Sequence, residues 1–366
     1  MDLHERIDAL ADRLARGGEL TDPAWRDALH AVPRHLFVPP VALAVPDEGP
    51  EYAVDRDRAP GAWWDAIYAD QAIVTQLDDG ATDVGAGRGD YSSSVSAAGV
   101  AVEFLELLAP YDGDRVLEIG TGSGWTAALL SHRLGERNVT SVEIDEGLHL
   151  RAAANLERAG YAPRLVLGDG TRGLPEGAPY DRVHVAAGVR EVPYAWVAQT
   201  RPGGVIVFPW MPDFEPGHKV RLMVDDTGVA TGRFSGSAGY MMLRSQRPPP
   251  APEHQGGHRE RPATLDPRRI FRSCRGLDVA VAGTLPDVHV ALREGPPYEV
   301  WLWTDESGAH VTGSVVRQFG PRDLWDELEA VFFRWIRWGQ PDRARFGITV
   351  SPEGQHVWLD DPDRVL

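Results

Sequence analysis

The chain has 366 residues, of which 43% are hydrophobic and 25% charged, a balance that excludes an intrinsically disordered protein. Its formal net charge of -17 argues against a polyanionic partner, so we expect no nucleic acid. The single cysteine, Cys274, excludes an internal disulfide and a cysteine-rich metal site. The histidines show no metal-binding spacing, so we expect no metal.

The length indicates two domains, or one domain with a large extension. The first residues lack the basic region and apolar core of a secretion signal, and no apolar run approaches the length of a membrane span. We therefore expect a cytoplasmic protein with no membrane partner.

The N-terminal region is predicted to contain a helical pair followed by an extended segment. Apolar residues recur at helical spacing from 3 to 14, and Asp22 and Pro23 are a typical start for a second helix, which ends near 32. Residues 32–39 contain prolines at both ends, so we expect them to run extended.

The next region is predicted to be a loop and then a helix. Residues 78–96 are rich in Gly, Asp and Ser, which favours a flexible loop that is either idle or a lid over a pocket. From 98 to 108 apolar residues return at helical spacing.

The central region alternates strands with helices, a pattern that predicts a parallel, doubly wound α/β sheet. The expected helices are 125–134 and 147–159. The expected strands are 115–119, 139–143, 164–167, 181–185 and 205–208.

The remainder is predicted to form edge strands, a linker and a small domain. Residues 219–224 and 238–244 read as antiparallel strands added to the sheet. A proline-rich linker at 248–264 then separates residues 1–247 from a C-terminal α+β domain at 265–366.

Three segments of the central region indicate a nucleotide-cofactor pocket. Residues 116–124 read as a strand that enters a glycine turn, 142–145 as a strand that ends in an acid, and 168–170 as a polar turn after a third strand. A pyrophosphate-binding turn needs a small residue where this chain has Trp125. Glu118 also suits a cationic ligand better than a phosphate, so S-adenosylmethionine (SAM) is favoured over NAD.

The residues resemble the protein-L-isoaspartate O-methyltransferases over roughly 5–245. The resemblance rests on Val-Pro-Arg-His-Leu-Phe-Val at 32–38, Tyr-Ala-Asp-Gln at 68–71, Ser-Val-Ser at 94–96 and the glycine loop at 117–125. It implies a class I (Rossmann-like) SAM-dependent methyltransferase that methylates a carboxylate of a peptide or protein.

The resemblance also implies which residues act. SAM is expected to contact a set of residues on the loop and the strand ends, with Glu143 at the ribose and Asp169 at the adenine amino group, although Asp169 has a capping role as its alternative. This set is Ser94, Glu118, Gly120, Thr121, Gly122, Gly124, Glu143, Asp169 and Gly170.

Two residues are predicted to act on the substrate. Ser96 is expected to orient the acceptor carboxylate, its alternative being a loop serine or helix cap. Arg190 follows the fourth strand and is expected to pair with that carboxylate, its alternative being a solvated surface arginine.

The acceptor stays open between two forms of aspartate. The family usually has proline where Ala98 stands, and a small-residue run ending in proline where this chain has 187–190. We lean slightly toward tailoring of a ribosomally made peptide, as in the long actinobacterial branch, whose ester closes to a succinimide or aspartimide. The alternatives are general L-isoaspartate repair, a non-catalytic SAM-binding protein and a nicotinamide-dependent oxidoreductase.

Overall fold

The computed structural model describes residues 2–213, 217–252 and 257–366, which group into two compact units. The first unit consists of Met1–Ala187, Ala195–Phe208 and Met223–Gly228. The second consists of Gly188–Tyr194, Pro209–Leu222 and Val229–Leu366.

A parallel sheet forms the centre of the first unit, as the alternating pattern predicts. Its strand order is β7-β6-β5-β8-β9, with all neighbours parallel. Val116 pairs with Val139 on one side and Arg182 on the other, so β5 is the central strand. The strands are β5 (Val116–Ile119), β6 (Val139–Glu143), β7 (Arg164–Leu167), β8 (Tyr180–Val185) and β9 (Thr200–Trp210).

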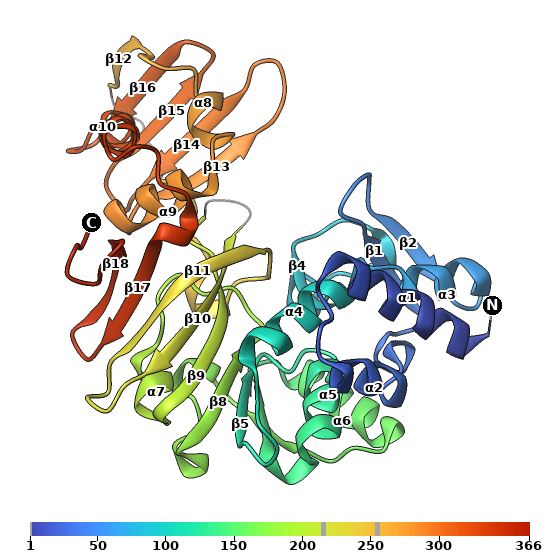
Figure 1. The fold of residues 1–366 in the computed structure, drawn as a ribbon. Coiled ribbons are helices and arrows are strands. Elements are labelled where there is room, and N and C mark those ends of the chain that lie inside the picture. Colours follow the sequence, from blue (N-terminus) through green and yellow to red (C-terminus); the bar gives the residue numbers. More distant parts are fainter. Residues whose placement is uncertain (1, 214–216, 253–256) are drawn as a thin grey trace. The chain divides into compact units, whose positions relative to one another are not determined.

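Four helices connect these strands or precede them, and their bounds confirm the helices expected at 98–108, 125–134 and 147–159. The Asp145 carboxylate accepts a hydrogen bond from the Leu148 N–H and so caps the third of them, which ends at Gly160 in the left-handed region. The helices are α4 (Ala98–Leu108), α5 (Trp125–Leu134), α6 (Glu146–Ala159) and the short α7 (Tyr194–Ala198) (Figure 1).

The N-terminal part of the first unit contains the expected helical pair, which packs together (Figure 1). Asp2 and Glu5 form a reciprocal capping box at the start of the first helix, and Asp22 caps the second. A third helix follows at residues that the sequence analysis did not assign. The three are α1 (Leu3–Gly17), α2 (Pro23–Ala31) and α3 (Pro60–Tyr68).

An antiparallel sheet in the order β2-β1-β3-β4 lies beside these helices, and the loop prediction for 78–96 is wrong over its last part. Ser93 and Ser94 belong to a strand that pairs with β3, because their backbone groups find partners there. The prediction of an extended 32–39 is also wrong in part, since Arg34–Phe37 forms a 3₁₀ turn after Pro33. The strands are β1 (Val41–Val45), β2 (Tyr52–Asp55), β3 (Ala72–Leu77) and β4 (Tyr91–Val95).

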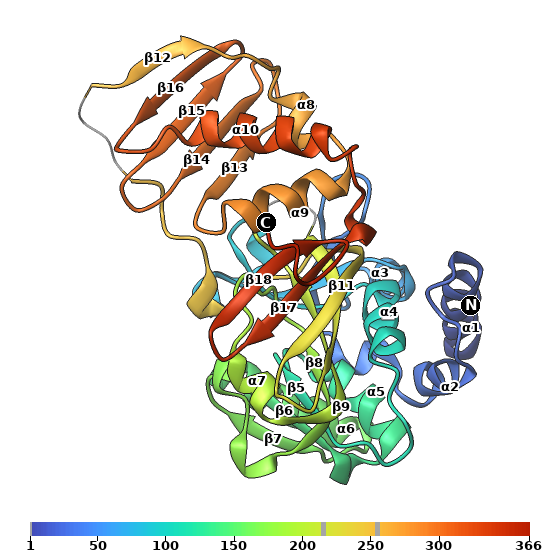
Figure 2. The same cartoon turned by 60° about the vertical axis from the view of Figure 1, so that its left-hand side comes forward.

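The second unit contains two sheets. One has the order β18-β17-β11-β10 and the other the order β12-β16-β15-β14-β13. Helix α10 (Leu324–Arg337) lies across the face of the five-stranded sheet (Figure 2) and buries Trp325, Leu328 and Phe332. The other helices are α8 (Arg268–Phe271) and α9 (Arg275–Thr284).

The second unit has the mixture of helices and strands expected of its C-terminal part, and one expected strand is placed wrongly. The strand expected at 238–244 lies instead at 230–238, because it follows directly on the turn formed by residues 225–228. The bounds are β10 (Gly217–Val224), β11 (Ala230–Ala238), β12 (Arg259–Pro262), β13 (His289–Arg293), β14 (Glu299–Trp303), β15 (Gly308–Thr312), β16 (Val315–Phe319), β17 (Phe346–Ser351) and β18 (Gly354–Leu359).

The division into units differs from the expected boundary at the linker. Ala230 pairs with Val350, so the last strands of the chain join a sheet with residues that precede 247. Part of the expected linker, 253–256, lies outside the described residues. In the described ranges, no helix combines the length and apolar character needed to span a membrane, and no group of three His, Cys, Asp or Glu side chains is placed to hold a metal.

Burial shifts the pKa values of a histidine and an aspartate in the second unit, and in both cases it favours the neutral form. His218 packs beside the rings of Trp210 and Phe234, and burial, followed by the charges of Arg343 and Arg275, lowers its pKa to about 3. Burial raises the pKa of Asp278 to about 6, although Arg275 lies 3.2 Å from its carboxylate. The folded unit therefore keeps both groups neutral at mildly acidic pH.

These shifts predict opposite pH dependences for two variants. Between about pH 6.5 and pH 4 the unfolded chain gains a proton on His218, which lowers the free energy of unfolding, while the folded chain gains one on Asp278, which raises it. The Asp278→Asn variant should lose stability in the second unit as the pH falls through this range, and His218→Gln should gain it, each by about 1.4 kcal/mol per pH unit at most. Urea unfolding across this pH range measures both. In the parent chain the contributions of His218 and Asp278 offset each other. If both variants followed the same pH dependence as the parent, this offset would be contradicted. His356→Gln serves as the control.

Candidate active site

The glycine loop connects β5 to α5 and adopts the backbone conformation that its glycines permit. Gly122 and Gly124 have φ of 56° and 91°, in the left-handed region that residues with a Cβ rarely adopt. The Gly124 N–H donates to the Thr121 carbonyl at 2.9 Å and closes the turn before Trp125. The loop thus presents bare backbone at the carboxyl end of the central strand, where open α/β sheets bind ligands.

Glu143, at the end of β6, is held in place by the loop. Its two carboxylate oxygens accept hydrogen bonds from the Gly122 N–H at 2.8 Å and from the Asp145 N–H at 3.0 Å. Each oxygen retains capacity for a further donor, so the carboxylate is positioned to accept the two hydroxyls of a ribose. This geometry supports the role predicted for Glu143.

Glu118 has a different environment from Glu143. Its side chain is fully buried and accepts a hydrogen bond from the Ser141 hydroxyl at 2.6 Å, and that hydroxyl also lies 2.6 Å from Thr121 Oγ1. The other carboxylate oxygen lies 3.6 Å from His184 Nδ1 and has no hydrogen bond among the described residues. Glu118 therefore supports the loop from beneath, and its direct contact with a cofactor stays a prediction.

The end of β7 supplies an acid and an apolar surface follows β6. Asp169 is half-buried, and one of its oxygens accepts the Thr171 N–H at 3.0 Å, so it caps a turn and has its second oxygen left for a ligand. Ile144, next to Glu143, is 44% exposed and offers an apolar face for a base. Gly170 is buried, and its carbonyl accepts a hydrogen bond from the Trp196 indole N–H. Its contact with a cofactor stays a prediction.

The serines of β4 lie against the glycine loop. A Cβ placed on Gly122 would lie 3.7 Å from Ser93 Oγ and 3.8 Å from the Ser94 carbonyl oxygen. Strand β4 and the glycine loop are therefore close enough to be in contact. Ser96 follows the strand, is half-buried and does not cap α4, whose cap position is Ala97. The capping alternative for Ser96 is therefore wrong, and its hydroxyl is available to a substrate.

Arg34 fixes the turn that carries Ser96. Its guanidinium is buried and donates to the Ser96 carbonyl at 2.6 Å and the Val95 carbonyl at 3.1 Å. It also donates to the carbonyls of Ile67 and Gln71 at 2.6 and 2.8 Å. A fifth carbonyl, that of Ala69, accepts at 3.4 Å. Burial lowers the pKa of Arg34 to about 9, so the group remains charged at neutral pH, and among the described residues it donates to five carbonyls and pairs with no carboxylate.

Asp70 holds the same turn from its other end. Its carboxylate accepts the Gly99 N–H at 2.7 Å, at the first turn of α4, and pairs with Arg13 at 2.6 Å. Negative charge is favourable at a helix N-terminus, so Asp70 stabilises the start of α4. Arg34 and Asp70 together fix the backbone on both sides of Ser96.

Trp125 occupies the position where a dinucleotide-binding turn has its third small residue. The indole is buried, donates its N–H to the Val32 carbonyl at 3.2 Å and lies 5.3 Å beneath the Arg34 guanidinium. The start of α5 is thus covered by a packed ring. This arrangement does not fit a pyrophosphate, and the loop, Glu143, Ile144 and Asp169 fit an adenosine with a cationic sulfonium.

Arg190 belongs to the second unit and its guanidinium is already engaged there. It pairs with Asp213 at 2.7 Å and donates to the carbonyls of Pro286 and Val288 at 2.6 and 2.9 Å. His289 Nδ1 lies 2.5 Å from the same Asp213 oxygen. These partners favour a structural role, and nothing in the geometry supports the predicted contact of Arg190 with a carboxylate.

Sequence reasoning missed the residues that position the site. Arg34 and Asp70 lie inside the two motifs that carry the resemblance, but neither received a role. The only available signal was the position of Arg34 between Pro33 and the apolar residues 36–38, in a segment with few other polar side chains. Ile144 was also missed, although an apolar residue directly after a ribose-binding acid is placed to contact the base.

Comparison with known proteins agrees with the motifs. A family model described as "Protein-L-isoaspartate(D-aspartate) O-methyltransferase (PCMT)" matches residues 63–225. A protein-L-isoaspartate O-methyltransferase of Aeropyrum pernix is 36% identical over 204 residues, which cover 55% of this chain and 65% of the relative. One of Thermococcus onnurineus is 47% identical over 118 residues, or 32% of this chain and 53% of the relative. The chain thus spans less than two thirds of these two relatives.

Two further matches cover more of the chain. The protein-L-isoaspartate O-methyltransferase 2 of Archaeoglobus fulgidus is 30% identical over 253 residues, which cover 67% of this chain and 96% of the relative. A solved structure titled protein-L-isoaspartate O-methyltransferase aligns with a TM-score of 0.56 at 22% identity, over 97% of this chain and 100% of that one. The latter likeness concerns the fold, and it extends into the C-terminal region.

The fold and the loop define a class I, SAM-dependent methyltransferase architecture, as predicted. Within that class, the chain belongs to the protein-L-isoaspartate O-methyltransferase family. The family match confirms SAM as the cofactor expected from the glycine loop, and the residues described above fit it.

Arg34→Gln should destabilise the first unit. The substitution leaves up to five buried or partly buried carbonyls without this donor, so the free energy of unfolding should fall by roughly 3 kcal/mol or more, and Arg34→Lys should recover only part of it. Urea unfolding measures the change. Arg137→Gln, an exposed arginine of the same unit, is the control and should change little. Equal stability of the Arg34 and Arg137 variants would contradict the assigned role.

Glu143→Gln should weaken cofactor binding without unfolding the chain. The neutral amide replaces charge-assisted hydrogen bonds, so the affinity for S-adenosylhomocysteine should fall roughly tenfold to a hundredfold. Titration calorimetry measures the dissociation constant. Glu146→Gln, three residues along on exposed surface, should bind as the parent does. An unchanged affinity of the Glu143 variant would place the ribose elsewhere.

Proposed function

We propose that the protein transfers a methyl group from SAM to the side-chain carboxylate of an L-isoaspartyl residue in a protein or peptide. The single observation that carries the proposal is the juxtaposition of the Ser93–Ser94 strand with the glycine loop, which brings the Ser96 turn to the cofactor edge of the first unit. Family membership and the names of the relatives support this choice of acceptor.

The chain's residues act by binding and orientation. SAM, when bound, supplies an electrophilic methyl group, and the acceptor carboxylate is already ionised at neutral pH, so no general base is required. Glu143 would hold the ribose, and the Ser96 hydroxyl would donate to one carboxylate oxygen and leave the other directed at the methyl group. Such positioning is worth roughly 7–11 kcal/mol of barrier in favourable cases.

Rigidity of the Ser96 turn is what makes this positioning effective. Arg34 and Asp70 fix the backbone on either side of Ser96, so the hydroxyl needs no reorganisation when a carboxylate arrives. The methyl ester is a better electrophile than the acid, and the next backbone nitrogen would then close a succinimide without further help from the protein.

A dedicated peptide substrate is the second candidate. Two departures from the family pattern favour it, Ala98 where the family usually has proline and residues 187–190 where it usually has a small-residue run ending in proline. The names of the relatives favour isoaspartate instead, and a solved structure with the same printed name shares the fold over 97% of this chain, which supports the same choice. We therefore place L-isoaspartate first and normal aspartate second.

Labelled SAM and a pair of peptides that differ only in isoaspartate or aspartate test the proposal. We expect base-labile label on the isoaspartyl peptide, and Ser96→Ala should lower kcat by roughly tenfold to a hundredfold while the affinity for S-adenosylhomocysteine is kept. Ser92→Ala, on the same strand, is the control. Label only on an aspartyl peptide from a neighbouring precursor gene would support tailoring, and label on neither would favour a cofactor-binding protein without turnover.

A further inference from the structure

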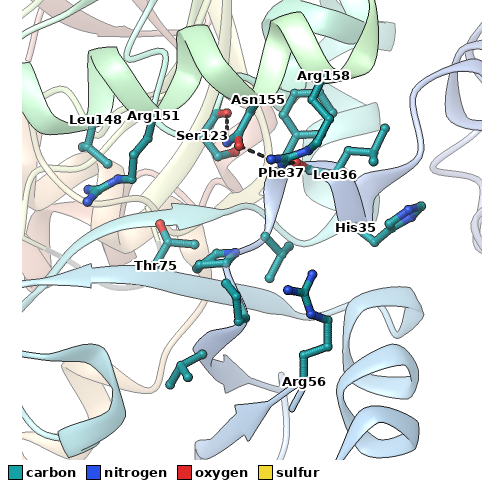
Figure 3. Close-up of a pocket in the computed structure, with 14 residues that line it drawn as sticks. His35, Leu36, Phe37, Arg56, Thr75, Ser123, Leu148, Arg151, Asn155 and Arg158 are labelled. Atoms are coloured by element: carbon teal, nitrogen blue, oxygen red, sulfur yellow. Dashed lines mark hydrogen bonds between the residues drawn. The ribbon is translucent and has the colours of Figure 1, made fainter.

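A pocket of about 530 Å³ lies in the first unit, apart from the residues that fit the cofactor. Its walls are the segment 35–41, the side of α6, Thr75 of β3 and Arg56 after β2 (Figure 3). None of the residues assigned to SAM lines it, and its nearest link to the cofactor loop is Ser123. The volume is typical of a site for a small ligand.

The charge of this pocket is opposite to that of the chain. Three arginines, Arg56, Arg151 and Arg158, line it together with His35, and none of its 14 described lining residues is an aspartate or glutamate. The whole chain has 54 acidic residues against 37 lysines and arginines. A cavity with only cationic side chains in an acidic protein focuses a positive potential.

The cations reach the pocket from two sides. Arg151 and Arg158 come from α6, and Arg56 points up into the space from the β2 side in Figure 3. Arg158 is fixed by hydrogen bonds to the Leu36 carbonyl and to Asn155 Oδ1. Within the described ranges, the Arg151 guanidinium has no hydrogen bond or ion pair. Its donors are therefore available to a ligand.

The pKa of His35 responds to the charges of neighbouring arginines. Its Nδ1 lies 2.8 Å from the Tyr68 hydroxyl, and its ring packs against Trp64. Burial, followed by the charges of Arg158 and Arg56, lowers the pKa of His35. Arg158 and Arg56 are therefore the cations that act on this ring, and Arg56 also lies 4.0 Å from the Asp57 carboxylate.

We propose that this pocket binds an oxyanion group, either a phosphate or a carboxylate, through the arginines that line it, Arg56 on the β2 side and Arg151 and Arg158 on α6. Planar guanidinium groups bind both oxyanions through paired hydrogen bonds, and Thr75 and Asn155 add neutral hydrogen-bonding groups. The apolar walls from Val38 to Val41 would contact the body of the ligand. The inference does not depend on the methyl-transfer reaction.

Titration calorimetry with two probes tests the proposal on the full chain. The probes are inorganic phosphate and an acetylated, amidated tri-aspartate peptide. Arg56→Gln and Arg151→Gln should each weaken binding roughly tenfold, because each removes a charge-assisted contact. Arg137→Gln should have no effect. S-Adenosylhomocysteine should bind both pocket variants as it binds the parent, which shows that they are folded.

A second readout comes from His35. A bound anion should raise the pKa of this ring, and added salt should reduce the shift. Proton NMR with and without phosphate measures that pKa. Tighter binding of phosphate would identify a phosphate-bearing ligand, and tighter binding of the peptide an acidic peptide segment. Binding of neither probe, or equal loss in the Arg137 variant, would overturn the proposal.

Discussion

The buried guanidinium of Arg34 is the interaction on which the candidate active site depends. It joins the turn of Ser96 to the end of α3 and lies over the indole of Trp125 at the start of α5. A charge without a carboxylate partner persists in the interior only where dipoles surround it, and here backbone carbonyls provide them. The acceptor side and the cofactor side of the site are therefore fixed by one side chain.

The two carboxylates near the glycine loop divide the work of shaping it. Glu143 faces the loop backbone and keeps capacity for ligand hydroxyls, whereas Glu118 supports the loop through Ser141 and Thr121. The difference follows from their positions, since Glu118 lies within the central strand and Glu143 ends a neighbouring one. An acid before the first glycine can thus act on the loop rather than on the ligand.

The sequence predicted the parallel sheet and its helices because those elements carry their own local signals. Apolar strands, the Asp145 cap and the glycine that follows α6 are readable within a few residues. The antiparallel sheet of the N-terminal part was not predictable in this way. Its strand at 91–95 consists of a tyrosine, three serines and a valine, a weak local signal, and pairing with β3, some fifteen residues earlier, makes it a strand.

The site followed the same rule. Glu143 and the glycines were predicted from local motifs, but the partners of Arg34 and Arg190 lie up to 62 and 99 residues away, where local motifs give no information. Arg190 was placed correctly after the fourth strand, and its long-range contacts with Asp213 and the 286–289 segment assign it a structural part in the second unit.

Strand β11 connects two distant stretches of the second unit, since it precedes the proline-rich segment and pairs with β17 from the end of the chain. A chain that stopped at the proline-rich segment would leave the N–H and C=O groups of β11 without partners along one edge. Such an edge invites association with other copies. The last hundred residues are consequently part of a sheet that begins before the proline-rich segment. Truncation to the span shared with its smaller relatives would expose the edge of β11 and favour aggregation.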